Sequence, residues 1–166
     1  MITVRTAAVA LLAACTALAP PRAEASFGCS VAAVGVNFGA YDPLLATPDD
    51  SSGRVSVTCS NVPNTGANTV NYTVALSQGT AGNFAPRRLA SGAARLDYNL
   101  FRDAGRTQVW GNGTSGSFLI SGTMRVGPGQ GNGTRTNTHD IFGRIPAQQD
   151  TATGAYADTI VVTLTF

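Results

Sequence analysis

The C-terminal stretch Tyr156–Phe166 constrains the fold more than any other part of this sequence. Its second half consists almost entirely of β-branched and aromatic residues, which favour a β-strand. Period-two alternation places Ile160, Val162, Leu164 and Phe166 on one face, as expected for a strand that covers a core. Because the sequence ends at Phe166, we expect any strand on the open side of this one to come from elsewhere.

The first 25 residues predict a secretory signal peptide. Arg5 supplies the positive n-region, and Ala7–Ala19 is apolar but too short to span a bilayer as a helix. Ala23-Glu24-Ala25 is a small-x-small cleavage site. We therefore expect residues 1–25 to be removed on export, and residues 26–166 to form one domain with no membrane span.

The cysteines add two expectations about the exported chain. Leu12-Ala-Ala-Cys15 looks like a lipobox, so lipidation of Cys15 is an alternative, although the intact cleavage site downstream favours an ordinary residue of the signal helix. Cys29 and Cys59 remain in the mature chain, and two cysteines in a secreted domain most simply pair. No metal site is expected, because two thiols and the lone His139 do not make four ligands.

Beyond the signal peptide the pattern predicts short strands separated by turns, with no segment of helical period. The first apolar run is Val31–Phe38, and Thr107–Trp110 is short and extended. Alternating rows or extended runs also occur in Arg54–Ser60, Val70–Ser77, Ala94–Phe101, Gly116–Val126 and Thr138–Ile145. Pro86–Ala90 is a possible short edge strand. Eight or so such strands predict an all-β antiparallel sandwich.

The sequence also predicts the local backbone structure at two places. Pro48–Gly53 is polar and predicts a loop. Gly122 lies inside an extended run, where it predicts a β-bulge.

Candidate catalytic residues are few, so we expect that the protein is not an enzyme and that it binds no cofactor. His139-Asp140 lacks a Gly-x-Ser-x-Gly elbow to complete a triad. Asp97 and Asp103 are a conceivable carboxylate pair for glycoside hydrolysis, but turn chemistry accounts for Asp103. Arg and Asp are nearly balanced in the mature chain, with no basic run, so nucleic acid is not an expected partner.

Two further features have plain structural interpretations. The Arg87-Arg88 pair is expected to lie on a solvated edge. Trp110 is a candidate for exposed contacts, with core packing as the better default.

Several stretches, taken in order, resemble a known family. They are Phe27-Gly-Cys-Ser30, Val36-Asn-Phe-Gly-Ala-Tyr-Asp-Pro43, Gly53-Arg-Val-Ser-Val-Thr-Cys59, Tyr72-Thr-Val-Ala-Leu-Ser77, Leu96-Asp-Tyr-Asn-Leu-Phe-Arg-Asp103, Trp110-Gly111, Ile141-Phe-Gly-Arg-Ile145 and Gly154-Ala-Tyr-Ala-Asp-Thr-Ile160. The ordered set is similar to the spore coat protein U domain family, which includes the pilins of archaic chaperone–usher pili.

This resemblance implies a pilin-type, immunoglobulin-like sandwich that lacks its final strand. The expected partners are a periplasmic chaperone, an outer-membrane usher and a sister subunit that donates a strand. The family's disulfide maps onto Cys29 and Cys59. The unfilled groove would lie beside the final strand, whose apolar row Ile160, Val162, Leu164 and Phe166 would line one of its walls. The implied route is export through the periplasm to the cell surface, in a pilus or coat.

The chain departs from a donating pilin before its first mature cysteine. Only Ser26-Phe27-Gly28 precede Cys29 after cleavage, and Thr16–Ser26 contains two prolines and no alternating apolar row. We therefore expect a structural subunit that accepts a strand but does not donate one. The alternative is a tip adhesin that binds a surface or glycan through its loops, around Trp110 or Gly127–Gly133.

Overall fold

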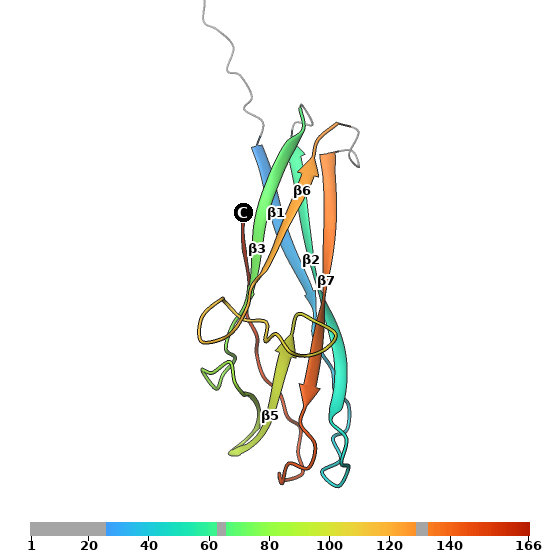
Figure 1. Ribbon diagram of the computed structural model, residues 1–166, viewed down its shortest axis with the longest axis vertical. Helices are drawn as coiled ribbons and strands as arrows, with labels where there is room; N and C mark the ends of the chain where they lie inside the picture. Colours follow the sequence, from blue (N-terminus) through green and yellow to red (C-terminus); the bar gives the residue numbers. More distant parts are fainter. Residues whose placement is uncertain (1–25, 63–65, 129–132) are drawn as a thin grey trace, which may run out of the picture.

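The computed structural model describes residues 26–62, 66–128 and 133–166, and these form two antiparallel β-sheets (Figure 1). The strands are β1 (Ser26–Val34), β2 (Asp49–Val62), β3 (Asn68–Leu76), β4 (Arg87–Ser91), β5 (Ala94–Phe101), β6 (Ile120–Val126), β7 (Thr134–Ile145) and β8 (Val162–Thr165). One sheet has the order β1-β2-β7-β5-β4 and the other β6-β3-β8. The predicted all-β sandwich is therefore confirmed.

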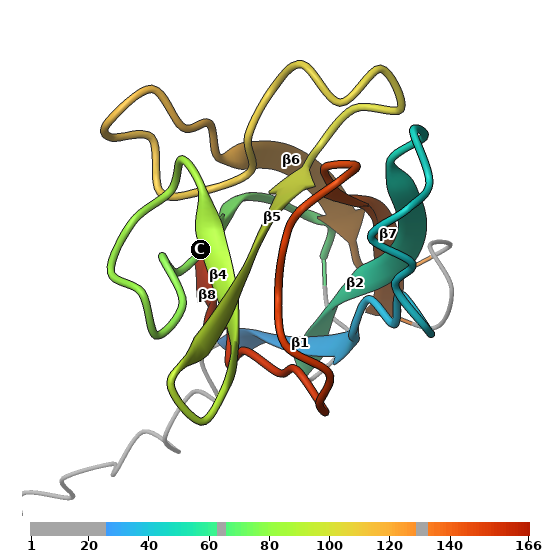
Figure 2. The ribbon, with the colours of Figure 1, turned by 90° about the horizontal axis from the view of Figure 1, so that it is seen from below.

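The two sheets curl around a shared interior, which Figure 2 shows from one end of the molecule. Alternation along the strands fills this interior: on β3, Val70, Tyr72, Val74 and Leu76 are buried while their neighbours face out. Corresponding rows come from β2, β5, β6 and β7. Burying each of these large side chains contributes about 1.5–3 kcal/mol, so the core is the main source of stability.

Trp110 belongs to this core, as the default interpretation predicted. Its side chain is fully buried, and its indole Nε1 donates a 3.0 Å hydrogen bond to the carbonyl oxygen of Val74. Trp110 is therefore not available for external contacts.

The disulfide is present where the sequence predicts it. Cys29 and Cys59 lie directly opposite each other in the β1–β2 ladder, with Cα atoms 4.0 Å apart. The bond fixes β1, an edge strand, to the buried β2.

The expected loop at Pro48–Gly53 is largely wrong. β2 already begins at Asp49, and Asp49–Gly53 pair with Ile145–Ile141 of β7. The polar side chains gain partners there: Arg144 donates to Asp50 through both Nε and Nη2, at 2.7 and 2.8 Å. An ion pair across the ladder thus extends a strand that composition alone would end.

The expected bulge at Gly122 is also wrong. Gly122 sits in regular register opposite Tyr72, on the inward-facing row of β6. A Cβ atom at this position would overlap the Tyr72 ring. Glycine is there to make room for an inward-pointing aromatic side chain and leaves the ladder intact.

Two more glycines make room for the segment that follows β1. After Val34 the chain brings Val36 and Phe38 against the core cluster. A Cβ at Gly143 would overlap both of these side chains, and one at Gly53 would overlap the Val34 carbonyl. The segment after β1 therefore crosses β2 and β7 at their glycines.

β8 is shorter than the predicted final strand. Only Val162–Thr165 are in strand conformation, paired with Leu76–Thr73 of β3. Val161 still accepts a 2.9 Å backbone hydrogen bond from Ser77, so the pairing begins just before β8.

Candidate functional site

β1 and β8 are edge strands that border the same seam between the two sheets. Among the strands described, β1 pairs with β2 alone and β8 with β3 alone. The rings of Phe27 and Phe166 meet across the seam, with centroids 6.3 Å apart. Figure 1 shows the C-terminal end of the chain beside β1 and β3. The sandwich is thus open along one side, between these two edges.

The backbone of β8 offers hydrogen-bonding groups to this seam. Because the Val161 carbonyl points to β3, where Ser77 binds it, the alternation of an antiparallel ladder turns the backbone groups of Val162 and Leu164 away from β3. No other strand in the described part of the chain pairs with them. They are available to a further strand.

The side chains of the predicted groove strand face the interior in three of four cases. Ile160, Val162 and Leu164 are half-buried and pack against the core cluster. Phe166 is 52% exposed and lies outside that cluster, against Phe27. The row is therefore present, while its role in accepting a strand stays a prediction.

A cavity of about 190 Å³ opens between the end of β1 and the start of β8. Its walls come from both sheets and include Val34, Leu76, Leu100, Ile160 and Val162. Apolar side chains dominate the lining, so the cavity suits a large apolar side chain better than water.

A polar network fixes the wall of the cavity next to β8. The hydroxyl of Tyr98 donates to Asp158 Oδ2 at 2.7 Å, and the backbone N–H and hydroxyl of Thr80 both donate to Oδ1 at 2.8 Å. Burial raises the pKa of Tyr98, and its hydrogen bond to Asp158 raises the pKa further. The segment leading into β8 is therefore tied to β5 of the opposite sheet.

Arg87 and Arg88 lie in different environments. The prediction that both lie on a solvated edge is wrong for Arg87. Arg87 is fully buried, and its guanidinium donates to the carbonyls of Ser77 and Trp110 and to the side-chain oxygen of Asn99. Burial lowers the pKa of Arg87. Its burial could not be predicted from the sequence, because a basic residue in a short edge strand is normally solvated.

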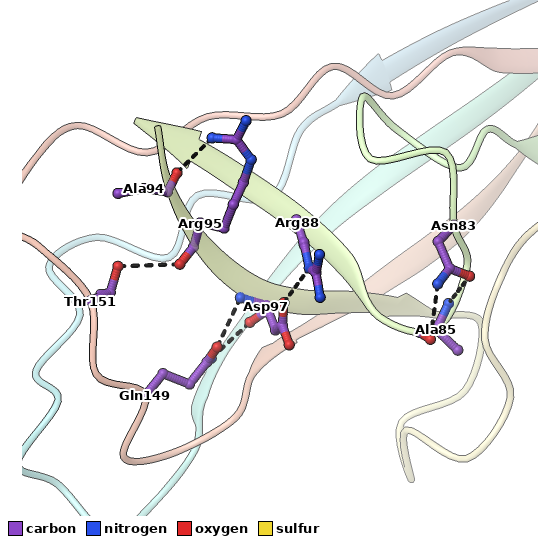
Figure 3. Close-up of polar contacts among 8 residues, drawn as sticks. All are labelled: Asn83, Ala85, Arg88, Ala94, Arg95, Asp97, Gln149 and Thr151. Carbon is purple, nitrogen blue, oxygen red and sulfur yellow. Dashed lines mark hydrogen bonds and ion pairs between the residues drawn. The ribbon is translucent and has the colours of Figure 1, made fainter. Parts of the chain in front are cut away.

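Arg88 is the exposed member, and its partner is one of the two candidate catalytic carboxylates. Figure 3 shows Arg88 of β4 beside Asp97 of β5, where Nε donates to Oδ1 at 2.8 Å. The backbone of Asp97 is held by the Gln149 side chain, through two 2.8 Å hydrogen bonds. Asp97 therefore has a structural partner on its own hairpin.

Asp103 stabilises a turn, as its sequence context suggested. Its carboxylate accepts from the backbone N–H groups of Thr107 and Gln108 and from the Thr107 hydroxyl, at 2.8–3.1 Å. Partial desolvation acts to raise the pKa of Asp103, but these hydrogen bonds outweigh it and lower the pKa.

His139 also has a structural setting. Its Nε2 lies 2.9 Å from the Tyr72 hydroxyl, and the same hydroxyl accepts from Asn137 Nδ2 at 3.0 Å. In the neutral tautomer whose Nε2 is unprotonated, the Tyr72 hydroxyl donates to Nε2. Burial lowers the pKa of His139, opposed by the nearby Asp140.

The described residues contain neither a cluster of metal ligands nor a helix that could span a membrane. No three His, Cys, Asp or Glu side chains gather there as metal ligands would. No helix within those residues has the length and apolar character needed to cross a bilayer.

Sequence reasoning located one wall of the seam and missed the other. The C-terminal row was visible from alternation, but nothing marked β1 as the facing edge or Phe27 as the contact of Phe166. The signal that existed was Gly53 and Gly143, whose missing side chains let the chain after β1 cross the sheet.

Comparison with known proteins agrees with this architecture. The model of the Spore Coat Protein U domain family matches residues 12–163. Protein U of Myxococcus xanthus is 30% identical over 148 residues, which cover 85% of this chain and 76% of that protein.

Solved structures of similar fold include a chaperone–subunit complex. It is the CsuC–CsuE chaperone–tip adhesion subunit pre-assembly complex from the archaic chaperone–usher Csu pili of Acinetobacter baumannii, with a TM-score of 0.51 and 21% identity. The match covers 85% of this chain and 40% of that chain. At this identity the similarity establishes the shared fold.

Proposed function

This chain belongs to the Spore Coat Protein U domain family. We propose that it is a structural, non-enzymatic subunit that is exported to a chaperone–usher surface pilus or coat and assembled by strand complementation. A periplasmic chaperone would first lend a strand to the seam between β1 and β8. A sister subunit would later replace it, after passage through an outer-membrane usher. The mature domain would be residues 26–166, with residues 1–25 as the signal peptide; that peptide and Cys15 lie outside the described residues.

The observation that carries this proposal is the pair of open edges on either side of an apolar cavity. β8 directs backbone groups of Val162 and Leu164 into the seam, and its apolar row is only half covered. An added strand would pair with these groups and bury the row. Without one, the edge is an aggregation hazard.

We further propose that the subunit accepts a strand and does not donate one. Support comes from the sequence before Cys29, where Thr16–Ser26 contains Pro20 and Pro21 and has no period-two apolar row. Such a subunit would end a fibre or coat a surface without extending a homopolymer.

The test is to prepare the mature protein with and without a peptide copied from the N-terminal extension of a sister subunit. We expect a soluble one-to-one complex with a higher melting temperature, whereas a peptide of the same composition with scrambled alternation should give none. The lone protein should aggregate and form no long fibres in electron micrographs. A stable monomer that ignores the peptide would refute the acceptor role, and homopolymeric fibres would refute the terminal role.

A tip adhesin is the second candidate, and one observation favours it. Trp110 is buried, and residues 129–132 of the other proposed loop lie outside the described residues. The loop between β1 and β2, however, presents Leu44 at 87% and Leu45 at 54% exposure. If this loop contacts a surface, replacing both leucines with serine should abolish retention on that surface and leave the melting temperature unchanged.

A further inference from the structure

The seam between β1 and β8 is not uniform along its length. At one end, Phe27 of β1 meets Phe166 just after β8, with ring planes tilted by 56°. These rings are 42% and 52% exposed, and neither belongs to the core cluster. At the other end, Val34 and Ile160 line the apolar cavity. One end is bridged by side chains and the other is hollow.

The spacing of the two edges adds a physical constraint. A strand hydrogen-bonded on both sides lies about 4.8 Å from each neighbour, so its neighbours stand roughly 9.6 Å apart. Cα atoms of β1 and β8 approach within 8 Å of each other. An incoming strand therefore cannot pair along the whole seam until these edges separate and the two rings part.

We propose that Phe27 and Phe166 form a gate that closes one end of the groove in the unpaired subunit. This inference rests on the strand-acceptor function proposed above. A partner strand enters at the cavity end, where a large apolar side chain finds space, and opens the gate last. Until then the rings shield each other and the Leu164 end of the row from water.

The gate predicts a specific kinetic effect. Parting two aromatic rings adds to the barrier for complete insertion, so Phe27→Ala should speed association of a full-length donor peptide by about fivefold. A shortened peptide that fills only the cavity end should bind Phe27→Ala and wild type at the same rate. Phe118→Ala is the matched control, because Phe118 has the same 42% exposure but stacks on Arg102 away from the seam.

The experiment follows the fluorescence anisotropy of labelled donor peptide added to freshly refolded mature protein. A faster rate for Phe27→Ala with the long peptide alone supports the gate, and Phe166→Ala should add nothing further, since both changes remove one contact. Phe27→Leu, which keeps an apolar side chain, guards against a folding defect and should show an intermediate rate. Equal rates for wild type and Phe27→Ala would overturn the gate alone. No binding by any variant would overturn the acceptor function and the gate with it.

Discussion

Tyr98 of β5 donates a 2.7 Å hydrogen bond to Asp158, and this bond joins the segment that leads into β8 to the opposite sheet. Gly79 lies so close to this carboxylate that a Cβ there would overlap it. The start of β8 is thus held by a buried phenol and an adjoining turn.

Removing this hydroxyl tests how far the groove depends on it. Tyr98→Phe leaves Asp158 without one of its donors, and we expect a loss of about 1.5–3 kcal/mol in the free energy of unfolding. The affinity for a donor peptide should fall as well, because Tyr98 and Asp158 both line the cavity. Urea unfolding and peptide titration measure the two effects.

Tyr41→Phe is the control for this change. The Tyr41 hydroxyl also makes hydrogen bonds, to the Pro146 carbonyl and from the Gln149 backbone N–H, but these residues belong to a loop outside the cavity. The Tyr41→Phe variant should lose stability and keep its affinity for the donor peptide. Equal affinity losses in both variants would mean that Tyr98 acts only through global stability.

Gly122 gives a second prediction, about core packing. Gly122→Ala would place a methyl group in the space of the Tyr72 ring, so we expect a loss of about 1–3 kcal/mol in the free energy of unfolding. Gly28→Ala is the matched control, since it is also a strand glycine but a Cβ there meets nothing within 4 Å. Denaturant unfolding of both variants measures the difference, and similar small effects would contradict the packing argument.

Alternation was enough to predict most strands, and it failed where partners lie far away in the sequence. β5 was predicted at Ala94–Phe101, as observed, because its apolar row is unbroken. The start of β2 was missed because Asp50 is stabilised by Arg144, which lies on β7. Gly122 was misinterpreted as a bulge because the side chain that requires a glycine there, Tyr72, lies on the neighbouring strand β3.

The same distinction between local patterns and distant contacts holds for the candidate site. Its β8 wall could be predicted from one local row of side chains. The β1 wall, the buried Arg87 and the Phe27–Phe166 contact could not, because each depends on how the two sheets meet. A single sequence carries no direct record of such contacts between sheets.

His139 makes stability depend on pH in a defined direction. Burial lowers its pKa in the folded protein, so the unfolded chain binds the proton more readily. The free energy of unfolding should therefore be highest above the ordinary histidine pKa of about 6.5 and fall as the pH drops below it. In the tautomer whose Nε2 accepts from Tyr72, protonation would also remove that acceptor.

This prediction is checked by unfolding at about pH 7.5 and about pH 5.5, on either side of that value. His139 is the one histidine in the sequence. His139→Gln, whose amide oxygen can still accept from Tyr72, should therefore flatten the difference. If His139→Gln keeps the same pH dependence of stability, that dependence must come from other titratable groups.

The Cys29–Cys59 bond should matter for both stability and the groove. It joins residues separated by 30 positions, and its removal in Cys29→Ala/Cys59→Ala should cost about 2–4 kcal/mol in the free energy of unfolding. Because it also holds β1, one wall of the seam, the double variant should bind a donor peptide more weakly. Reductant should destabilise the wild type and leave the double variant unaffected. Peptide mapping without reductant should recover the two linked cysteines from exported protein, and two free thiols there would show that the bond does not form on export.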